Sequence, residues 1–178
     1  MNVPNSLTMA RMILIVPFVI ILLNNTSGNG RFVALAIFIL ASMTDWLDGY
    51  LARKNHLVTN FGKFMDPLAD KLLVSAAMIS LVSMNRLPAW VVIIIISREF
   101  AISGFRLIAS DNGIVIAAGW WGKCKTVSQM IMIILLIADL GGVFTLLEEI
   151  FIWLALALTV ISLIDYIWKN RQVLNMQS

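Results

Sequence analysis

The chain has 178 residues, of which 60% are hydrophobic and only 13% are charged. A soluble domain of this size does not need so apolar a composition, so the sequence predicts an integral membrane protein that forms a single catalytic domain over residues 1–178. The net charge of +3 could indicate a nucleic-acid-binding protein. However, the basic residues are spread through apolar segments, which membrane topology explains better, and we expect no nucleic-acid partner.

The apolar stretches predict an all-α, polytopic fold with six transmembrane helices and a short N-terminal juxtamembrane segment. A helix needs about 20 residues to cross the hydrocarbon core, and most charge-free runs are shorter than that. The helices must therefore carry charged residues into the membrane, at ends that would face one side, which implies a water-filled cavity there. The predicted ranges are 6–24, 31–54, 60–84, 87–109, 116–139 and 144–168.

The N-terminal segment offers a helix cap at Asn5 or Ser6, after the break at Pro4. Thr8 and Arg11 are three residues apart, so on a helix they share a face that would point at the inner membrane surface. A capped helix with a basic anchor explains this pattern as well as a ligand contact does.

The distribution of lysine and arginine predicts the orientation of the helices. With both termini inside, only Arg31 and Arg86 of the 13 basic residues lie outside. Such an asymmetry is a strong positive-inside signal, so the cavity should face the cytoplasm. The basic residues expected at the inner side are Arg11, Arg53, Lys54, Lys63, Lys71, Arg98, Arg106, Lys123, Lys125, Lys169 and Arg171.

The second and third predicted helices carry two pairs of aspartates. Asp45 and Asp48 share one helix face, and Asp66 and Asp70 are one turn apart on the next helix. Four carboxylates in one pocket of low dielectric constant would repel each other and become protonated unless cations neutralised them. An oxygen-only ligand set suits Mg²⁺ or Mn²⁺, and magnesium is often shared with substrate phosphates. These aspartates therefore predict a metal site for a diphosphate substrate.

Two residues beside the first pair suit phosphate binding. Gly49 would let a phosphate approach the helix backbone closely, and Arg53 offers a planar fork for phosphate oxygens. Further along the chain, Arg98 and Arg106 are eight residues apart and nearly aligned on one helix face, and Lys123 follows Trp120 and Trp121. Anchoring to the inner leaflet is the alternative explanation for these cations.

The residues from Asp45 to Asp70 form the string D-x-x-D-G-x-x-A-R-x(8)-G-x(3)-D-x(3)-D. This string resembles the signature of the CDP-alcohol phosphatidyltransferases at every defined position. More loosely, the rest of the chain resembles the phosphatidylglycerophosphate synthase branch of that family. The resemblance implies transfer of a phosphatidyl group from CDP-diacylglycerol to an alcohol, with release of CMP.

The resemblance also implies roles for individual residues. A binuclear Mg²⁺ or Mn²⁺ centre would be held by Asp45, Asp48, Asp66 and Asp70. Asp70 would in addition be the catalytic base that takes the proton of the attacking hydroxyl group. The residues expected to hold CDP are Thr8, Arg11, Gly49, Arg53 and Thr59.

The acceptor is predicted from the remaining cations. An acceptor with its own phosphate requires cations beyond those that hold CDP, and Arg98, Arg106 and Lys123 supply them. We therefore favour glycerol 3-phosphate, which would give phosphatidylglycerol phosphate for phospholipid biosynthesis. Inositol phosphate or serine as the acceptor, and a divalent-cation transporter, are the alternatives. The resemblance further implies a homodimer in contact with membrane lipid, in the inner (cell) membrane of a bacterial type of cell.

Overall fold

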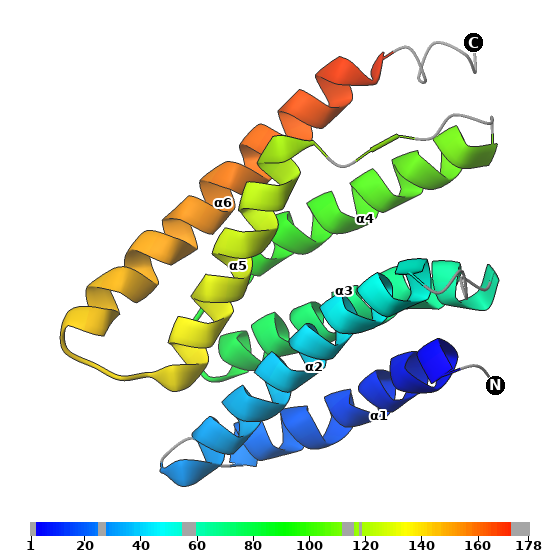
Figure 1. The fold of residues 1–178 in the computed structure, drawn as a ribbon. Helices are drawn as coiled ribbons and strands as arrows, with labels where there is room; N and C mark the ends of the chain where they lie inside the picture. The colour runs from blue at the N-terminus through cyan, green and yellow to red at the C-terminus, as the bar shows by residue number, and fades with distance from the viewer. Residues whose placement is uncertain (1–2, 25–27, 55–59, 112–115, 118, 172–178) are drawn as a thin grey trace. The chain divides into compact units, whose positions relative to one another are not determined.

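The computed structural model describes residues 3–24, 28–54, 60–111, 116–117 and 119–171. Within its helices, the side chains of residues 3–8, 45–54, 60–67 and 111 lie outside the described part. Figure 1 shows that the described chain is built from helices, and the prediction of an all-α fold with six helices is confirmed. These are α1 (Val3–Asn24), α2 (Asn29–Lys54), α3 (Asn60–Ser83), α4 (Ala89–Asp111), α5 (Trp120–Ala138) and α6 (Val143–Lys169).

The ends of the helices differ from the predicted ends by up to four residues, for local reasons. Helix α1 begins at Val3 rather than at residue 6, because Pro4 is tolerated in the first turn, where its missing N–H has no helical partner. Helix α5 begins at Trp120 rather than at residue 116, because Gly119 has an extended backbone (φ −69°, ψ 161°). Helix α3 ends where Asn85 adopts a left-handed conformation (φ 59°).

The turn after α3 is closed by two backbone hydrogen bonds. The N–H of Arg86 donates to the carbonyl of Leu81, and the N–H of Asn85 donates to the carbonyl of Val82, each at 2.9 Å. This is the Schellman pattern, in which a residue with positive φ satisfies the last helix carbonyls. Asparagine is one of the few residues other than glycine that adopts this conformation at low cost.

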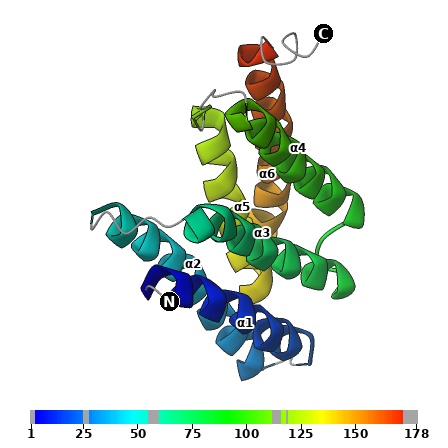
Figure 2. The same ribbon diagram turned by 90° about the vertical axis from the view of Figure 1, so that its right-hand side faces the viewer.

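The chain forms two compact units. The first comprises Met1–Arg86 with Leu136–Ala138, and the second comprises Leu87–Leu135 with Asp139–Ser178. In the first unit α1 packs against both α2 and α3, as Figure 2 shows. Its core includes Phe18 of α1 and Phe38 of α2, which are fully buried with ring centroids 5.9 Å apart. Helix α1 therefore contacts both helices that carry the aspartate signature.

In the second unit α4 packs against α6. Aromatic pairs join these helices at two levels, Trp90 with Trp153 and Phe105 with Tyr166, at centroid distances of 6.0 and 5.7 Å. The α4 residues of these pairs are separated by about four helical turns, which is most of the length of the helix. The two contacts therefore fix α6 along α4.

Helix α6 has the reverse of the pattern expected for a helix on the surface of a soluble protein. Its buried face consists of small or polar residues and one tyrosine: Glu148, Ala155, Thr159, Ser162 and Tyr166. Large apolar side chains such as Trp153, Val160, Ile164 and Trp168 are exposed instead. Small and polar residues between helices, with apolar residues outside, are typical of helices surrounded by lipid.

Two of the helices in the described part of the chain are long and apolar enough to cross a membrane, namely α5 and α6. Together with the exposed apolar face of α6, they indicate that the protein associates with a membrane. The arrangement of six membrane spans stays a prediction.

Candidate functional site

The predicted metal ligands lie on α2 and α3. Asp45 and Asp48 belong to the C-terminal half of α2, and Asp66 and Asp70 belong to the N-terminal half of α3. Each pair is thus on a continuous helix, as predicted. Asp70 is half-buried, whereas the side chains of the other three lie outside the described part. That the four carboxylates converge on one site stays a prediction.

The predicted CDP contacts come from α1 and α2. Arg11 is on α1 and is only 3% exposed, which is unusual for an arginine. Helix α1 packs against α2 and α3, so this guanidinium group belongs to the same three-helix unit as the aspartates. Thr8, Gly49 and Arg53 lie on α1 and α2 with side chains outside the described part, and Thr59 lies outside the described residues altogether.

The three cations predicted to bind the acceptor belong to the second unit. Arg98 and Arg106 lie on the continuous helix α4, as predicted, and Lys123 lies in the first turn of α5. The side chain of Arg98 is only 10% exposed, whereas Arg106 and Lys123 are exposed. The guanidinium group of Arg106 lies over the ring of Tyr166 of α6, 5.6 Å from its centroid. Cation–π contacts of this kind hold a guanidinium group in place without neutralising it.

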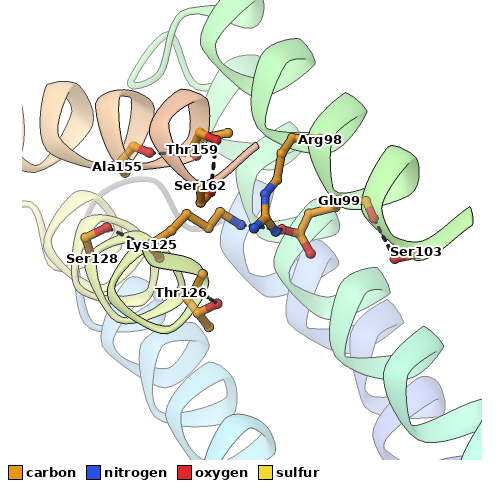
Figure 3. A network of polar contacts seen from close by, with 10 residues as sticks. Arg98, Glu99, Ser103, Lys125, Thr126, Ser128, Ala155, Thr159 and Ser162 are labelled. Carbon is orange, nitrogen blue, oxygen red and sulfur yellow. Dashed lines mark hydrogen bonds and ion pairs between the residues drawn. The ribbon is translucent and has the colours of Figure 1, made fainter. Parts of the chain in front are cut away.

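A buried ion network links α4 to α5, as Figure 3 shows. One carboxylate oxygen of Glu99, Oε1, accepts hydrogen bonds from Nη1 of Arg98 at 2.8 Å and from Nζ of Lys125 at 2.6 Å. The side chain of Lys125 is only 2% exposed. Charged groups so far from water are stable only when they are paired. Glu99 is therefore a counter-ion shared by two cations of this unit.

A second set of polar contacts lies where α5 begins. The carboxylate of Asp165 on α6 forms a salt bridge of 2.8 Å with Lys169, one turn later. Its Oδ2 lies 3.6 Å from where a Cβ at Gly119 would be. The carboxylate of Asp165 on α6 therefore lies near the start of α5.

Comparison with known proteins identifies the family. Residues 1–161 match the model of the CDP-alcohol phosphatidyltransferase family. The chain belongs to the CDP-alcohol phosphatidyltransferase family. A relative from Bacillus subtilis, named CDP-diacylglycerol--glycerol-3-phosphate 3-phosphatidyltransferase, is 46% identical, with 97% of each chain covered.

Two more distant bacterial relatives carry names of the same kind. A Haemophilus influenzae protein with the same name as the Bacillus protein is 40% identical over 93% of this chain and 91% of its own length. A Mycobacterium tuberculosis protein named probable phosphatidylglycerophosphate synthase is 38% identical over 93% of this chain and 80% of its own length. The match therefore extends well beyond the aspartate signature and includes the helices of both units.

CDP-alcohol phosphatidyltransferases generally use divalent metal ions, and the donor chemistry of this chain fits such ions. The signature supplies four carboxylates and no thiol or imidazole group, and hard cations such as Mg²⁺ and Mn²⁺ prefer oxygen ligands. Among the side chains that the structure describes, no three acidic, histidine or cysteine residues form a cluster. The donor types in the signature therefore fit such ions, and that its aspartates hold them stays a prediction.

Sequence reasoning did not foresee the role of Lys125 in this family member. Lys123 and Lys125 are two residues apart, so they point about 200° apart around α5. The structure shows which of the two is buried: Lys125 reaches Glu99, and Lys123 is exposed. The available signal was Glu99 itself, an acid in an apolar predicted helix, because such a residue requires a nearby cation.

Proposed function

We propose that the protein transfers the phosphatidyl group of CDP-diacylglycerol to glycerol 3-phosphate, giving phosphatidylglycerol phosphate and CMP in phospholipid biosynthesis. The observation that carries this proposal is the near full-length similarity to the Bacillus subtilis protein named for that activity. The complete signature from Asp45 to Asp70 supports the CDP-dependent half of the reaction. The match to residues 1–161 includes helices of both units, which supports one catalytic domain.

The cations of the second unit support glycerol 3-phosphate as the acceptor. Its phosphate needs positive groups beyond those that hold the diphosphate of CDP, and Arg98, Arg106 and Lys123 are available for it. A neutral alcohol would not require this number of cations. Arg98 is mostly buried, so a bond from it to a phosphate would be formed away from bulk water, where such bonds are strong.

The side chains on α2 and α3 would carry out the reaction itself. Asp70 would take the proton from the acceptor hydroxyl group, whose oxygen attacks the phosphorus atom next to the diacylglycerol. A new P–O bond forms while the phosphoanhydride bond to CMP breaks, and CMP leaves with the bridging oxygen. Asp45, Asp48, Asp66 and Asp70 would hold two divalent cations. Such cations neutralise charge that develops on the phosphates.

We further propose six membrane spans with the active site on the cytoplasmic side. The exposed apolar side chains of α6 and of α1, among them Ile13 and Val16, support contact with lipid. The excess of basic residues at one end of the helices supports the orientation. A site at the membrane surface suits the substrates, because the acyl chains of CDP-diacylglycerol need apolar surroundings while the acceptor is water-soluble. A homodimer is also proposed, and cross-linking in native membranes would test it.

An acceptor assay tests the proposed function. The purified protein, in lipid nanodiscs with Mg²⁺ or Mn²⁺, is given CDP-diacylglycerol and, separately, glycerol 3-phosphate, inositol phosphate or serine. We expect CMP release and a new phospholipid with glycerol 3-phosphate alone. Turnover with one of the other alcohols but not with glycerol 3-phosphate would refute the proposed acceptor while preserving the reaction class.

A further inference from the structure

The hydrogen-bonding groups of Arg98 are used unevenly. Its Nη1 donates to Glu99, and this is its side chain's one hydrogen bond to any described residue. The Nε atom is buried and has no hydrogen-bond partner in the described part of the chain. In a guanidinium group, Nε–H and Nη2–H point the same way and form an edge that matches two oxygens of a phosphate. Arg98 thus keeps its bidentate edge unused although the side chain is nine-tenths buried.

Glu99 determines how Arg98 is turned. Adjacent residues on a helix point about 100° apart and do not normally face each other, so Arg98 must bend to reach Glu99. Glu99 is itself held by Lys125 of α5, which donates to the same oxygen. With Nη1 occupied by this anchored carboxylate, the guanidinium group is fixed with its Nε–Nη2 edge directed away from Glu99.

Gly122 of α5 lies beside that edge. A Cβ atom added at Gly122 would be 3.5 Å from Nη2 of Arg98, so a longer side chain there would compete for the space at the edge. Gly104 of α4 offers a contrast, because a Cβ atom there would have no described atom within 4 Å. A large side chain at position 122, unlike a single methyl group, would therefore occupy space beside Nη2.

We propose that Glu99 is a positioning residue that presents the Nε–Nη2 edge of Arg98 to the acceptor phosphate, and that Gly122 keeps this edge open. The inference rests on the proposed function, since it concerns how the phosphorylated acceptor is held. A buried donor without a partner is costly, and two phosphate oxygens would satisfy both donors at once. The edge thereby selects an alcohol with a phosphate monoester over a neutral alcohol.

Paired substitutions at the two glycines provide the first test. Gly122→Ala, Gly122→Leu, Gly104→Ala and Gly104→Leu are prepared in the full-length protein in nanodiscs. We expect Gly122→Leu to raise the KM for glycerol 3-phosphate about tenfold, because the loss of one charge-assisted hydrogen bond weakens binding by about that factor. The kcat and the KM for CDP-diacylglycerol should stay within about twofold of the wild-type values. Gly122→Ala should have a smaller effect, because 3.5 Å is an ordinary contact distance. Neither substitution at Gly104 should change the KM for the acceptor.

Inorganic phosphate serves as a second probe of the same edge. As a competitive inhibitor against glycerol 3-phosphate, it should lose affinity in Gly122→Leu by about the same factor as the substrate, since both use phosphate oxygens. An unchanged inhibition constant for phosphate, with an unchanged KM for the acceptor, would overturn the proposal. A rise in the KM for CDP-diacylglycerol in place of that for the acceptor would also overturn it, because Arg98 would then serve the nucleotide.

Substitution of Glu99 tests the positioning role. Glu99→Gln retains the shape but removes the charge, and we expect a higher KM for glycerol 3-phosphate with little change in kcat. Glu99→Asp keeps the charge on a shorter side chain and should restore part of the acceptor affinity. Equal effects on kcat and on both KM values would indicate a structural role and contradict positioning. If Glu99→Gln does not fold, the acceptor KM values of the Gly122 and Gly104 variants test the proposal instead.

The outcomes for the wild-type protein separate this inference from the proposed function. No turnover of glycerol 3-phosphate by the wild type would refute the proposed function, and the inference with it. Turnover by the wild type with unaltered acceptor constants in Gly122→Leu and Glu99→Gln would refute the inference alone.

Discussion

At the scale of single residues, the aspartates have different predicted roles: one takes part in proton transfer, and others only bind metal ions. Asp70, which is half-buried, is the residue that we assign as the catalytic base. Its replacement by asparagine removes the proton acceptor but keeps an oxygen that can still act as a ligand. Asp45 is assigned to metal binding alone, so its loss should act through the metal ions.

We therefore expect Asp70→Asn to abolish turnover while it retains part of the affinity for CDP-diacylglycerol. Asp45→Asn should weaken the binding of the nucleotide and of the metal ion together. CMP release measures the first effect, and equilibrium binding of CDP-diacylglycerol across a Mn²⁺ titration measures the second. Turnover by Asp70→Asn at the rate of the parent protein would exclude Asp70 as the base.

A second residue-scale prediction concerns the buried hydroxyl group of Tyr166. This residue is 6% exposed, and its hydroxyl group has no hydrogen-bond partner among the described residues. Tyr166→Phe removes an unsatisfied group and keeps the ring beneath Arg106, so we expect the free energy of unfolding to rise by about 1 kcal/mol. Thermal unfolding in detergent micelles measures this change.

Ser162→Ala is the matched control for Tyr166→Phe. It removes another buried hydroxyl group from the same face of α6, but that group donates to the carbonyl of Thr159 at 2.9 Å. Because a satisfied bond is lost, Ser162→Ala should leave stability unchanged or lower it slightly. A loss of stability in Tyr166→Phe larger than in Ser162→Ala would mean that the tyrosine hydroxyl group is satisfied after all.

At the scale of helices, the sequence predicts the number of helices and the residues on them wherever a residue spacing repeats along the helix. Apolar runs, extended by the charged residues at their ends, predicted six helices, and the aspartate spacing of three and four residues placed each pair on one helix. The ends were less predictable, because they depend on single backbone conformations such as the extended Gly119 before α5.

The rotation of each helix about its own axis could not be predicted from the sequence. In the sequence, Lys123 and Lys125 are chemically equivalent. Which of them pairs with Glu99 depends on which face of α5 meets Glu99. The acceptor prediction accordingly included Lys123, whereas the buried lysine is Lys125. In the same way, Gly122 had no predicted role, because its proximity to Arg98 exists only once α4 and α5 have packed.

The ion pair between α4 and α5 gives a prediction at this scale. Lys125→Met removes one of the two cations bonded to Glu99 within a mostly buried network. Because Arg98 still pairs with Glu99, we expect a loss of about 1.5–3 kcal/mol, the value of one hydrogen bond to a charged group. Lys123→Met removes an exposed cation of the same chemistry and should leave stability nearly unchanged. Thermal unfolding of both variants, measured side by side, gives the comparison. Equal melting temperatures would show that the buried ion pair does not stabilise the packing of α4 against α5.

At the scale of the whole molecule, the reversed polarity of α6 must be explained by the surroundings of the protein. In water, the large apolar residues on its exposed face would be a strong aggregation liability. In lipid, the same face is solvated, while the small and polar residues of the other face pack against protein. This pattern supports the proposal that α6 is one of the membrane spans.

A charge placed on this face distinguishes lipid from water. Val160 lies in the central part of α6 and is 41% exposed, so Val160→Arg should cost about 2.5–3.5 kcal/mol if the residue faces the hydrocarbon core. Val143, the first residue of α6, is 79% exposed, and an arginine there can reach the interface at little cost. We expect Val160→Arg to lower the amount of folded protein recovered from membranes and Val143→Arg to leave it unchanged. Normal yield of both variants would mean that water covers the exposed face of α6, because an arginine is tolerated at any exposed position of a soluble helix.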